Sequence, residues 1–328
     1  MNEKEGDSSM KKIDRVVVYG SLGLRPGLSE LLWAFRKKHK LEEFPVYLDD
    51  HPFQLRDRIR RERENGMRTA DVVLVPHYMA LQLREEGVLA RHHSAELDSY
   101  PREFRDASHQ WFAIGVTFMS MAYNSKQLGE KDLPESLDDL SSGKMKGQLG
   151  MQSLTASKAG NLGAYYIAYL QRTVGSKKWM NLLHSLTGPN RPKTYDCIDH
   201  LLQGLLDGAV RIGLTVYSLA YFREKTSGSP VALLRMKEAP PMLTFTSAGL
   251  VSGAEDNGSA RRFLDFLLSE DAQRIIGTIA GIAPTRPGIS AAYPFELKYE
   301  SRSSFHPDAT DLKEISAALT TFKRLQLP

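Results

Sequence analysis

The sequence predicts an α/β protein built from two lobes that each contain a parallel sheet. Strand-like and helical segments alternate along the first hundred residues, and the alternation resumes after residue 147. A long apolar extended stretch, residues 111–125, lies between the two regions, and a second extended stretch follows at 242–253. Because the first stretch is too long for one strand of a compact sheet, we expect both to cross between the lobes.

The first lobe begins with a β-branched run that ends in glycine and serine, followed by apolar positions at helical spacing. Two further strand–helix units come next, and the last strand is a continuous apolar run. The expected strands are 15–23, 44–50 and 70–78, and the expected helices are 28–40, 53–66 and 79–90. Ligands of such sheets bind beyond the carboxyl ends of the strands, so the loops there are candidate binding loops.

The second lobe is predicted from a similar alternation. The expected strands are 147–153 and 209–217, and the expected helices lie within 154–175, 177–186 and 197–208. After the return crossing, residues 257–281 predict one or two helices, for which Asn257 or Ser259 can serve as the cap. The chain should end in a helix that packs on the surface.

These segments divide the chain into two lobes and a tail. At 328 residues there is room for two domains with sizeable cores. We expect lobe 1 to comprise residues 13–112 and 248–295, lobe 2 to comprise 113–247, and a helical tail to comprise 296–328.

Composition narrows the range of partners. The formal net charge is only +4, and the basic stretch at 56–68 interleaves its arginines with Asp57, Glu62 and Glu64. Alternating charges at helical spacing are typical of a solvated helix face, so we expect no nucleic-acid partner. The single cysteine, Cys197, excludes an internal disulfide and a cysteine-rich metal site, and we interpret it as a small packed residue. No cofactor is expected.

The sequence leaves two alternatives for localisation. No apolar run reaches the ~18 residues of a membrane span, and the opening "MNEKEGDSSMKKID" lacks the apolar core of a secretory signal. Either an export signal has been removed or the protein stays in the cytoplasm.

Six stretches carry a family resemblance in their order and spacing. They are "VVVYGS", "ADVVLVPHYMALQLREEGVLA", "WFAIGVTFMSMAYNSK", "LPESLDDLSSGKMKGQLGM", "GLTVYSLAYFREK" and "RRFLDFLLSEDAQRII". Over about residues 13–295 the chain resembles type 2 periplasmic solute-binding proteins of ABC importers, and within them the ferric-ion-binding branch. The resemblance implies a two-lobed periplasmic-binding-protein-like fold with the ligand cleft between the lobes, and a periplasmic or cell-surface location.

The resemblance also implies a ligand set from which this sequence departs. Ferric members hold the ion with a histidine in the first loop, a carboxylate after the third strand and two adjacent tyrosines, because Fe(III) prefers anionic oxygen donors. Here Gly23 stands where the histidine is expected, and Pro76 and His77 follow the third strand. Tyr217 has no adjacent tyrosine, and Tyr221 could replace one only if the chain forms a helical turn.

These departures favour a small polar or anionic solute over a bare ferric ion. Iron carried with a bound anion and direct binding of a ferric ion remain alternatives, and Tyr217 is the metal ligand if the ion is ferric. We expect no carboxylate cluster of the kind that a polyamine needs.

Hydroxyl groups and strand ends supply the candidate contacts. The stretch "SLTASKAG" places three hydroxyls just before a helix, whose unpaired N–H groups favour negative charge. A serine stands beside glycines in the first loop, and a histidine and a tyrosine end the third strand. The candidate ligand-binding residues are Ser21, Leu22, His77, Tyr78, Ser153, Thr155, Ala156, Ser157, Tyr217 and Tyr221.

The predicted two-lobed fold could serve three classes of function. A solute receptor would close its lobes on a ligand and dock on the membrane subunits of an ABC importer, as a monomer. A cytoplasmic sensor could use the same clamp. An enzyme is not expected, because the sequence contains no nucleophile elbow, no "HExxH" and no "GxxxxGK".

Overall fold

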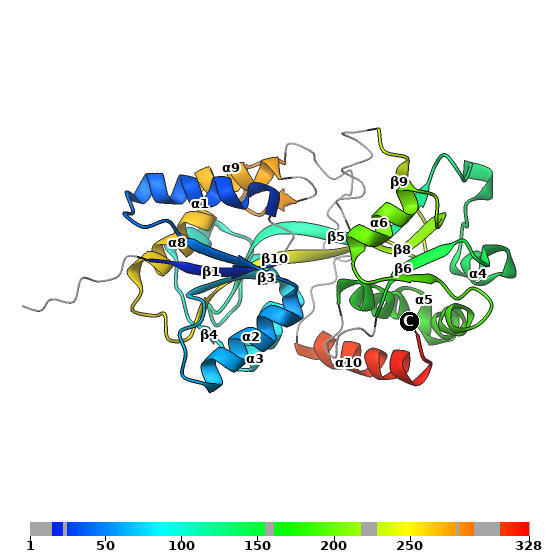
Figure 1. Ribbon diagram of the computed structural model, residues 1–328, viewed down its shortest axis with the longest axis horizontal. Helices are drawn as coiled ribbons and strands as arrows, with labels where there is room; N and C mark the ends of the chain where they lie inside the picture. Colours follow the sequence, from blue (N-terminus) through cyan, green and yellow to red (C-terminus); the bar gives the residue numbers. More distant parts are fainter. Residues whose placement is uncertain are drawn as a thin grey trace, which may run out of the picture.

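The computed structural model describes residues 15–21, 25–154, 161–217, 228–279, 282–291 and 309–327 (Figure 1). Two lobes lie side by side and are joined by two long strands, β5 (Phe112–Asn124) and β10 (Met242–Val251). The predicted two-lobed α/β fold is confirmed. One sheet runs through the whole molecule in the order β2-β1-β3-β10-β5-β8-β6-β7.

Lobe 1 is defined here by the elements on the β2 side of the crossing strands. Its parallel strands are β1 (Val17–Gly20), β2 (Val46–Asp49) and β3 (Val72–Pro76). The helices α1 (Arg25–His39), α2 (Pro52–Glu64) and α3 (His77–Glu85) follow these strands in turn. The chain returns to lobe 1 through β10, β4 (Leu89–Ala90) pairs with it, and α8 (Gly258–Leu268) and α9 (Glu270–Thr278) come next.

Lobe 2 contains the other parallel part of this sheet. Its strands are β6 (Leu149–Gln152), β7 (Lys193–Tyr195) and β8 (Ile212–Tyr217), with β9 (Val231–Leu234) paired to β5. Its helices are α4 (Leu137–Ser141), α5 (Leu162–Thr187) and α6 (Ile198–Leu206). The last helix, α10 (Ala309–Arg324), packs along α5, and Arg172 forms an ion pair of 2.6 Å with Glu314.

The crossing strands are irregular where they pass between the lobes. The β5–β10 pairing shifts register between Thr246 and Ser247, opposite Gly115 and Ala113. Such a bulge bends a strand and interrupts its ladder, and we expect the hinge between the lobes to lie here. The short strand β11 (Ala283–Pro284) pairs with β5 here, and a Cβ added to Gly115 would lie 2.4 Å from Ile282 Cγ2.

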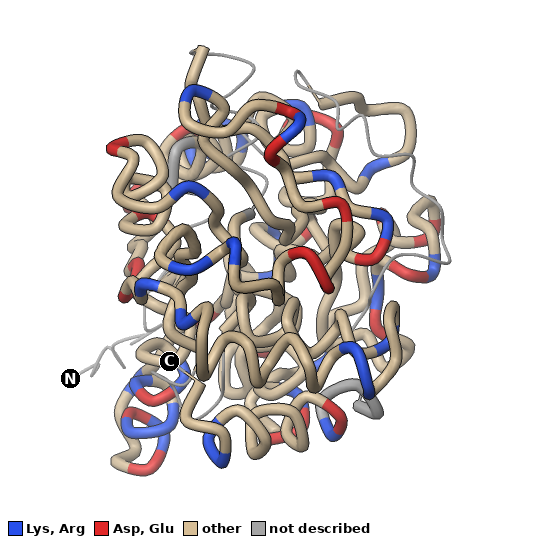
Figure 2. Tube along the Cα trace, turned by 90° about the vertical axis from the view of Figure 1, so that its right-hand side faces the viewer, with Lys and Arg blue, Asp and Glu red and all other residues tan. Residues whose placement is uncertain are grey.

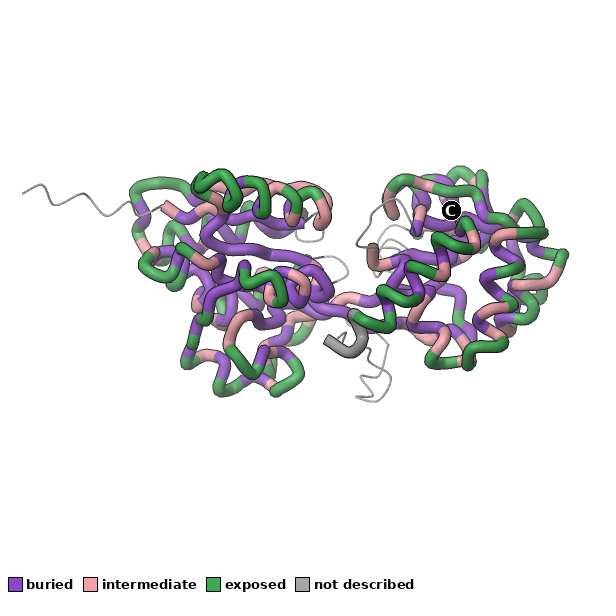
Figure 3. The backbone as a smooth tube through the Cα atoms, turned by 90° about the horizontal axis from the view of Figure 1, so that it is seen from below, coloured by how far each residue is buried: buried purple, intermediate pink, exposed green. Residues whose placement is uncertain are grey.

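Buried residues fill both lobes and continue through the strands that join them (Figure 3). Figure 2 shows that positions of lysine and arginine are interspersed with positions of aspartate and glutamate along the chain. In the basic stretch, Arg58 pairs with Glu62 at 2.8 Å and Arg56 pairs with Glu86. The first pair lies within α2 and the second joins α2 to the end of α3, so these arginines are paired with carboxylates of the protein.

Helix boundaries follow local signals where these are strong. Asn257 accepts hydrogen bonds from the backbone N–H groups of Ser259 and Ala260, which confirms it as the cap of α8. The two helices expected before and after residue 176 are joined across a kink at Gly175, whose φ is 77°. Among the described helices, none is both long and apolar enough to cross a bilayer.

Candidate solute-binding cleft

Strand directions bring two sets of carboxyl ends together between the lobes. Strand β5 runs from lobe 1 into lobe 2, and β8 is antiparallel to it, with Tyr217 opposite Met119 and Ile212 opposite Tyr123. Strand β8, and β6 parallel to it, therefore end toward lobe 1. Strand β3 is antiparallel to the returning β10, so β3 and its parallel neighbours end toward lobe 2. The region between these ends is where an α/β sheet binds ligands.

The loop after β1 begins with a buried residue. Ser21 is 8% exposed, and its backbone N–H donates to the carbonyl of Leu74 at 3.0 Å. The preceding Gly20 passes so close to Tyr47 that an added Cβ would lie 2.6 Å from the phenol oxygen. Leu22 lies outside the described residues.

His77 starts α3 at the carboxyl end of β3, and its side chain packs on the hinge. His77 Nδ1 lies 3.1 Å from Ser247 Oγ at the bulge in β10. The imidazole ring also packs edge-on against Trp111 and Phe245, and the residue is only 2% exposed. A ligand role for His77 stays a prediction.

Tyr78 is also packed against protein. The ring centroids of Tyr78 and of Tyr165, in α5, are 4.5 Å apart. Burial raises the pKa of the Tyr78 hydroxyl. Its proposed ligand contact also stays a prediction.

The loop that carries the predicted hydroxyls is tied at its base. Ser153 follows β6, and its carbonyl accepts a hydrogen bond of 2.6 Å from Asn161 Nδ2. Asn161 Oδ1 accepts from the backbone N–H of Ala164 at 2.9 Å and so caps α5. Thr155, Ala156 and Ser157 lie outside the described residues.

Asn161 was missed by sequence reasoning. The available signal was an asparagine just before a helical apolar run, which is a preferred cap. Its other hydrogen bond, to the carbonyl of Ser153 at the opposite end of the loop, corresponds to no sequence pattern.

Tyr217 is the last residue of β8 and pairs with Met119 in the middle of the crossing strand. Strand β8 therefore ends on the side that faces lobe 1, and a ligand contact by Tyr217 stays a prediction. Tyr221 lies outside the described residues, so its relation to Tyr217 remains a prediction.

Two carboxylates at the end of β2 were also missed. Asp49 pairs with Gly20 in the sheet, and Tyr47 Oη donates to Asp49 Oδ1 at 3.3 Å. Asp50 Oδ1 accepts from the backbone N–H of His51 at 2.7 Å. The signal was available, since the strand-like run at 44–50 ends in two aspartates. Both carboxylates lie at the carboxyl end of β2, which points toward lobe 2.

Three helices begin at this region without a side-chain cap. The residues before α2, α3 and α6 are His51, Pro76 and Cys197, and none of their side chains caps its helix. The first N–H groups of a helix have no intrahelical partner, and the helix dipole makes this end positive. These helix starts can donate hydrogen bonds to an anionic or polar solute. Across the described part of the chain, no three His, Cys, Asp or Glu side chains form a metal-binding group.

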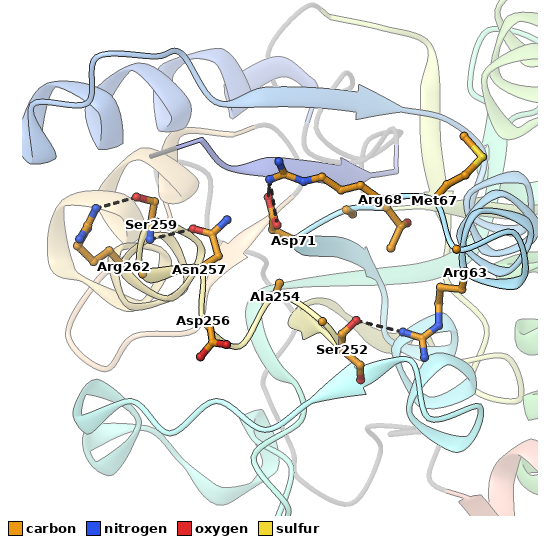
Figure 4. A pocket seen from close by; sticks show the side chains of 15 residues that line it. Arg63, Met67, Arg68, Asp71, Ser252, Ala254, Asp256, Asn257, Ser259 and Arg262 are labelled. Carbon is orange, nitrogen blue, oxygen red and sulfur yellow. Dashed lines mark hydrogen bonds and ion pairs between the residues drawn. The ribbon is translucent and has the colours of Figure 1, made fainter. Parts of the chain in front are cut away.

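A hollow of about 1010 Å³ lies at the opposite end of lobe 1, before β3 and after β10 (Figure 4). Three of its charged side chains, Arg63, Arg68 and Asp71, contact neighbouring protein groups. Arg68 pairs with Asp71 at 3.2 Å, Asp71 accepts from the backbone N–H of Val17, and Arg63 donates to the carbonyl of Ser252. Because it faces away from the carboxyl ends of the strands, this hollow is separate from the cleft.

Known proteins share this architecture over nearly the whole chain. The iron-bound HitA of Pseudomonas aeruginosa superposes with a TM-score of 0.79 at 21% identity, covering 95% of this chain and 99% of that one. AfuA of Actinobacillus pleuropneumoniae, with fructose-6-phosphate bound, gives a TM-score of 0.75 at 20% identity, covering 95% and 96%. At these identities the likeness shows the fold.

Sequence comparisons agree with the structural ones. The major ferric iron-binding protein of Neisseria meningitidis serogroup A is 22% identical over 195 residues, which span 58% of this chain and 57% of that relative. The model of a family described as bacterial extracellular solute-binding protein matches residues 68–307. The chain belongs to this family of bacterial extracellular solute-binding proteins.

Proposed function

We propose that this protein is the substrate-binding component of an ABC importer, which captures a small polar or anionic solute by closing its two lobes. One observation supports the proposal most strongly. The strands of lobe 1 end toward lobe 2 and those of lobe 2 end toward lobe 1, and the strands β5 and β10 that join the lobes contain a bulge. Solute contacts to both lobes would stabilise the closed form, which would then dock on the membrane subunits. In this proposal the protein acts outside the cytoplasm, as a monomer and without catalysis.

The groups around the cleft suit a solute with both acceptors and donors. The uncapped starts of α2, α3 and α6 offer N–H donors. Asp49 and Asp50 offer acceptors at the end of β2. A small molecule with hydroxyls and one anionic group would match both sets, and fructose-6-phosphate in AfuA is a ligand of this chemical kind.

Direct binding of ferric iron is the second candidate, because several relatives are named for it. The first loop has Gly23 where ferric members have histidine, and His77 follows β3 where they have a carboxylate. With one phenol at the end of β8, Tyr217 would serve as a hydrogen-bond donor or stacking platform.

Titration with ferric salt separates the two candidates. We expect no visible tyrosinate-to-iron charge-transfer band in the wild-type protein. Tyr217→Phe should weaken binding of the native solute by about 0.5 to 1.5 kcal/mol, because one hydrogen bond is lost. A charge-transfer band that is present in the wild-type protein and disappears in Tyr217→Phe would instead establish that the protein binds ferric iron directly through Tyr217.

A further inference from the structure

Two tyrosines from different lobes meet next to the hinge. Tyr78 is the second residue of α3 in lobe 1, and Tyr165 lies in the first turns of α5 in lobe 2. Their ring centroids are 4.5 Å apart with the planes inclined by 36°. Gln82, one turn further along α3, donates from Nε2 to Tyr165 Oη at 3.4 Å. Lobe 1 thus contacts Tyr165 through both a ring and a hydrogen bond.

Both rings are buried by this contact and its surroundings. Tyr78 is 5% exposed and Tyr165 is 2% exposed, and burial raises the pKa of both hydroxyls. One continuous apolar cluster contains the two rings and extends from Leu55 in lobe 1 to Phe322 in α10. Separating α3 from α5 would expose this aromatic surface to water, which is unfavourable.

The contact lies between the hinge and the hydroxyl loop. His77, the neighbour of Tyr78, contacts Ser247 at the bulge of β10. On the other side, the backbone N–H of Tyr165 donates to the carbonyl of Asn161. The side chain of Asn161 in turn donates to the carbonyl of Ser153, at the base of the predicted binding loop. A movement of α5 relative to α3 would therefore displace the base of the predicted binding loop relative to lobe 1.

We propose that the Tyr78–Tyr165 contact, with Gln82, limits how far the lobes open before a solute binds. Tyr165 is then a positioning residue that raises affinity by keeping the lobes near the arrangement that binds. The inference rests on the proposed clamp function. If only a fraction of the molecules has the lobes close enough to bind, the apparent affinity equals the intrinsic affinity multiplied by that fraction. A wider opening of the lobes would therefore lower the apparent affinity.

Small-angle X-ray scattering of the solute-free protein tests this proposal. The variants are Tyr165→Ala and the milder Tyr165→Leu, which retains apolar volume in case the alanine variant does not fold. Tyr169→Ala is the matched control, because Tyr169 is a buried tyrosine one turn along the same helix that packs on Tyr166 within lobe 2. Tyr165→Phe keeps the ring but removes the hydroxyl that accepts from Gln82, so it separates the contribution of the ring from that of the hydrogen bond.

We expect a larger radius of gyration for Tyr165→Leu and Tyr165→Ala, a value close to wild type for Tyr165→Phe, and no change for Tyr169→Ala. Tyr78→Leu should produce the same expansion, and combining it with Tyr165→Leu should add little, because both variants remove one contact. Superimposable profiles of wild type and Tyr165→Leu, with unchanged circular dichroism, would overturn the proposal. Since no solute is present, this outcome is distinct from a failure of the solute-binding function.

Discussion

Replacing Gln273 with alanine should lower the free energy of unfolding by about 4 kcal/mol. Gln273 is fully buried in α9, and its Nε2 donates to the carbonyls of Ile114 at 3.1 Å and Leu267 at 2.9 Å. Its Oε1 accepts from the backbone N–H groups of Thr285 at 2.8 Å and Arg286 at 3.1 Å. Each buried polar group that loses its partner costs about 1 to 3 kcal/mol. Urea denaturation followed by circular dichroism measures the loss.

The neighbouring Arg274 supplies the matched control. It forms an exposed ion pair with Glu270 one turn away on the same helix. Arg274→Ala should change stability by no more than about 0.5 kcal/mol, the range for exposed positions. If Gln273→Ala cost no more than this control, the side chain would not be the bridge that joins α9 to the start of β5.

The double variant Thr155→Ala with Ser157→Ala should weaken solute binding by about 1 to 3 kcal/mol, which corresponds to roughly 5- to 150-fold. Three hydroxyls precede the start of α5, whereas Asn161 already caps that helix. Because Asn161 caps this helix, we expect the hydroxyls of Thr155 and Ser157 to contact the solute. Isothermal titration calorimetry with the native solute measures the change.

Thr187→Ala is the control for this pair. Its hydroxyl donates to the carbonyl of Leu183 at the far end of α5, away from the cleft. Affinity should be unchanged in this variant. Unchanged affinity in the double variant as well, with the fold intact, would leave the loop without a binding role.

The sequence predicts the fold well where segments are long and strongly patterned. The apolar run at 111–125 forms the 13-residue crossing strand β5, and the helical pattern at 53–66 forms α2. Strands of two or three residues were missed, among them β4 and β7. Such short strands exist through pairing with distant partners, so no local pattern marks them.

The site is less predictable, because side-chain placement depends on residues that are distant in the sequence. The sequence places His77 and Tyr78 at the end of β3, and both lie there. Their packing is set by Ser247 of the crossing strand and Tyr165 of the other lobe, which no periodicity connects to them. Asp49, by contrast, ends a predicted strand and could have been proposed from the rule that ligands bind at strand ends.

Small-angle scattering with and without the native solute tests the central claim, that the lobes close on a small molecule. Native mass spectrometry of freshly purified protein identifies the solute to add. We predict that saturating solute shifts the wild-type protein to a smaller radius of gyration, because solute contacts to both lobes stabilise the closed form. An identical profile with and without solute at saturation would contradict the account.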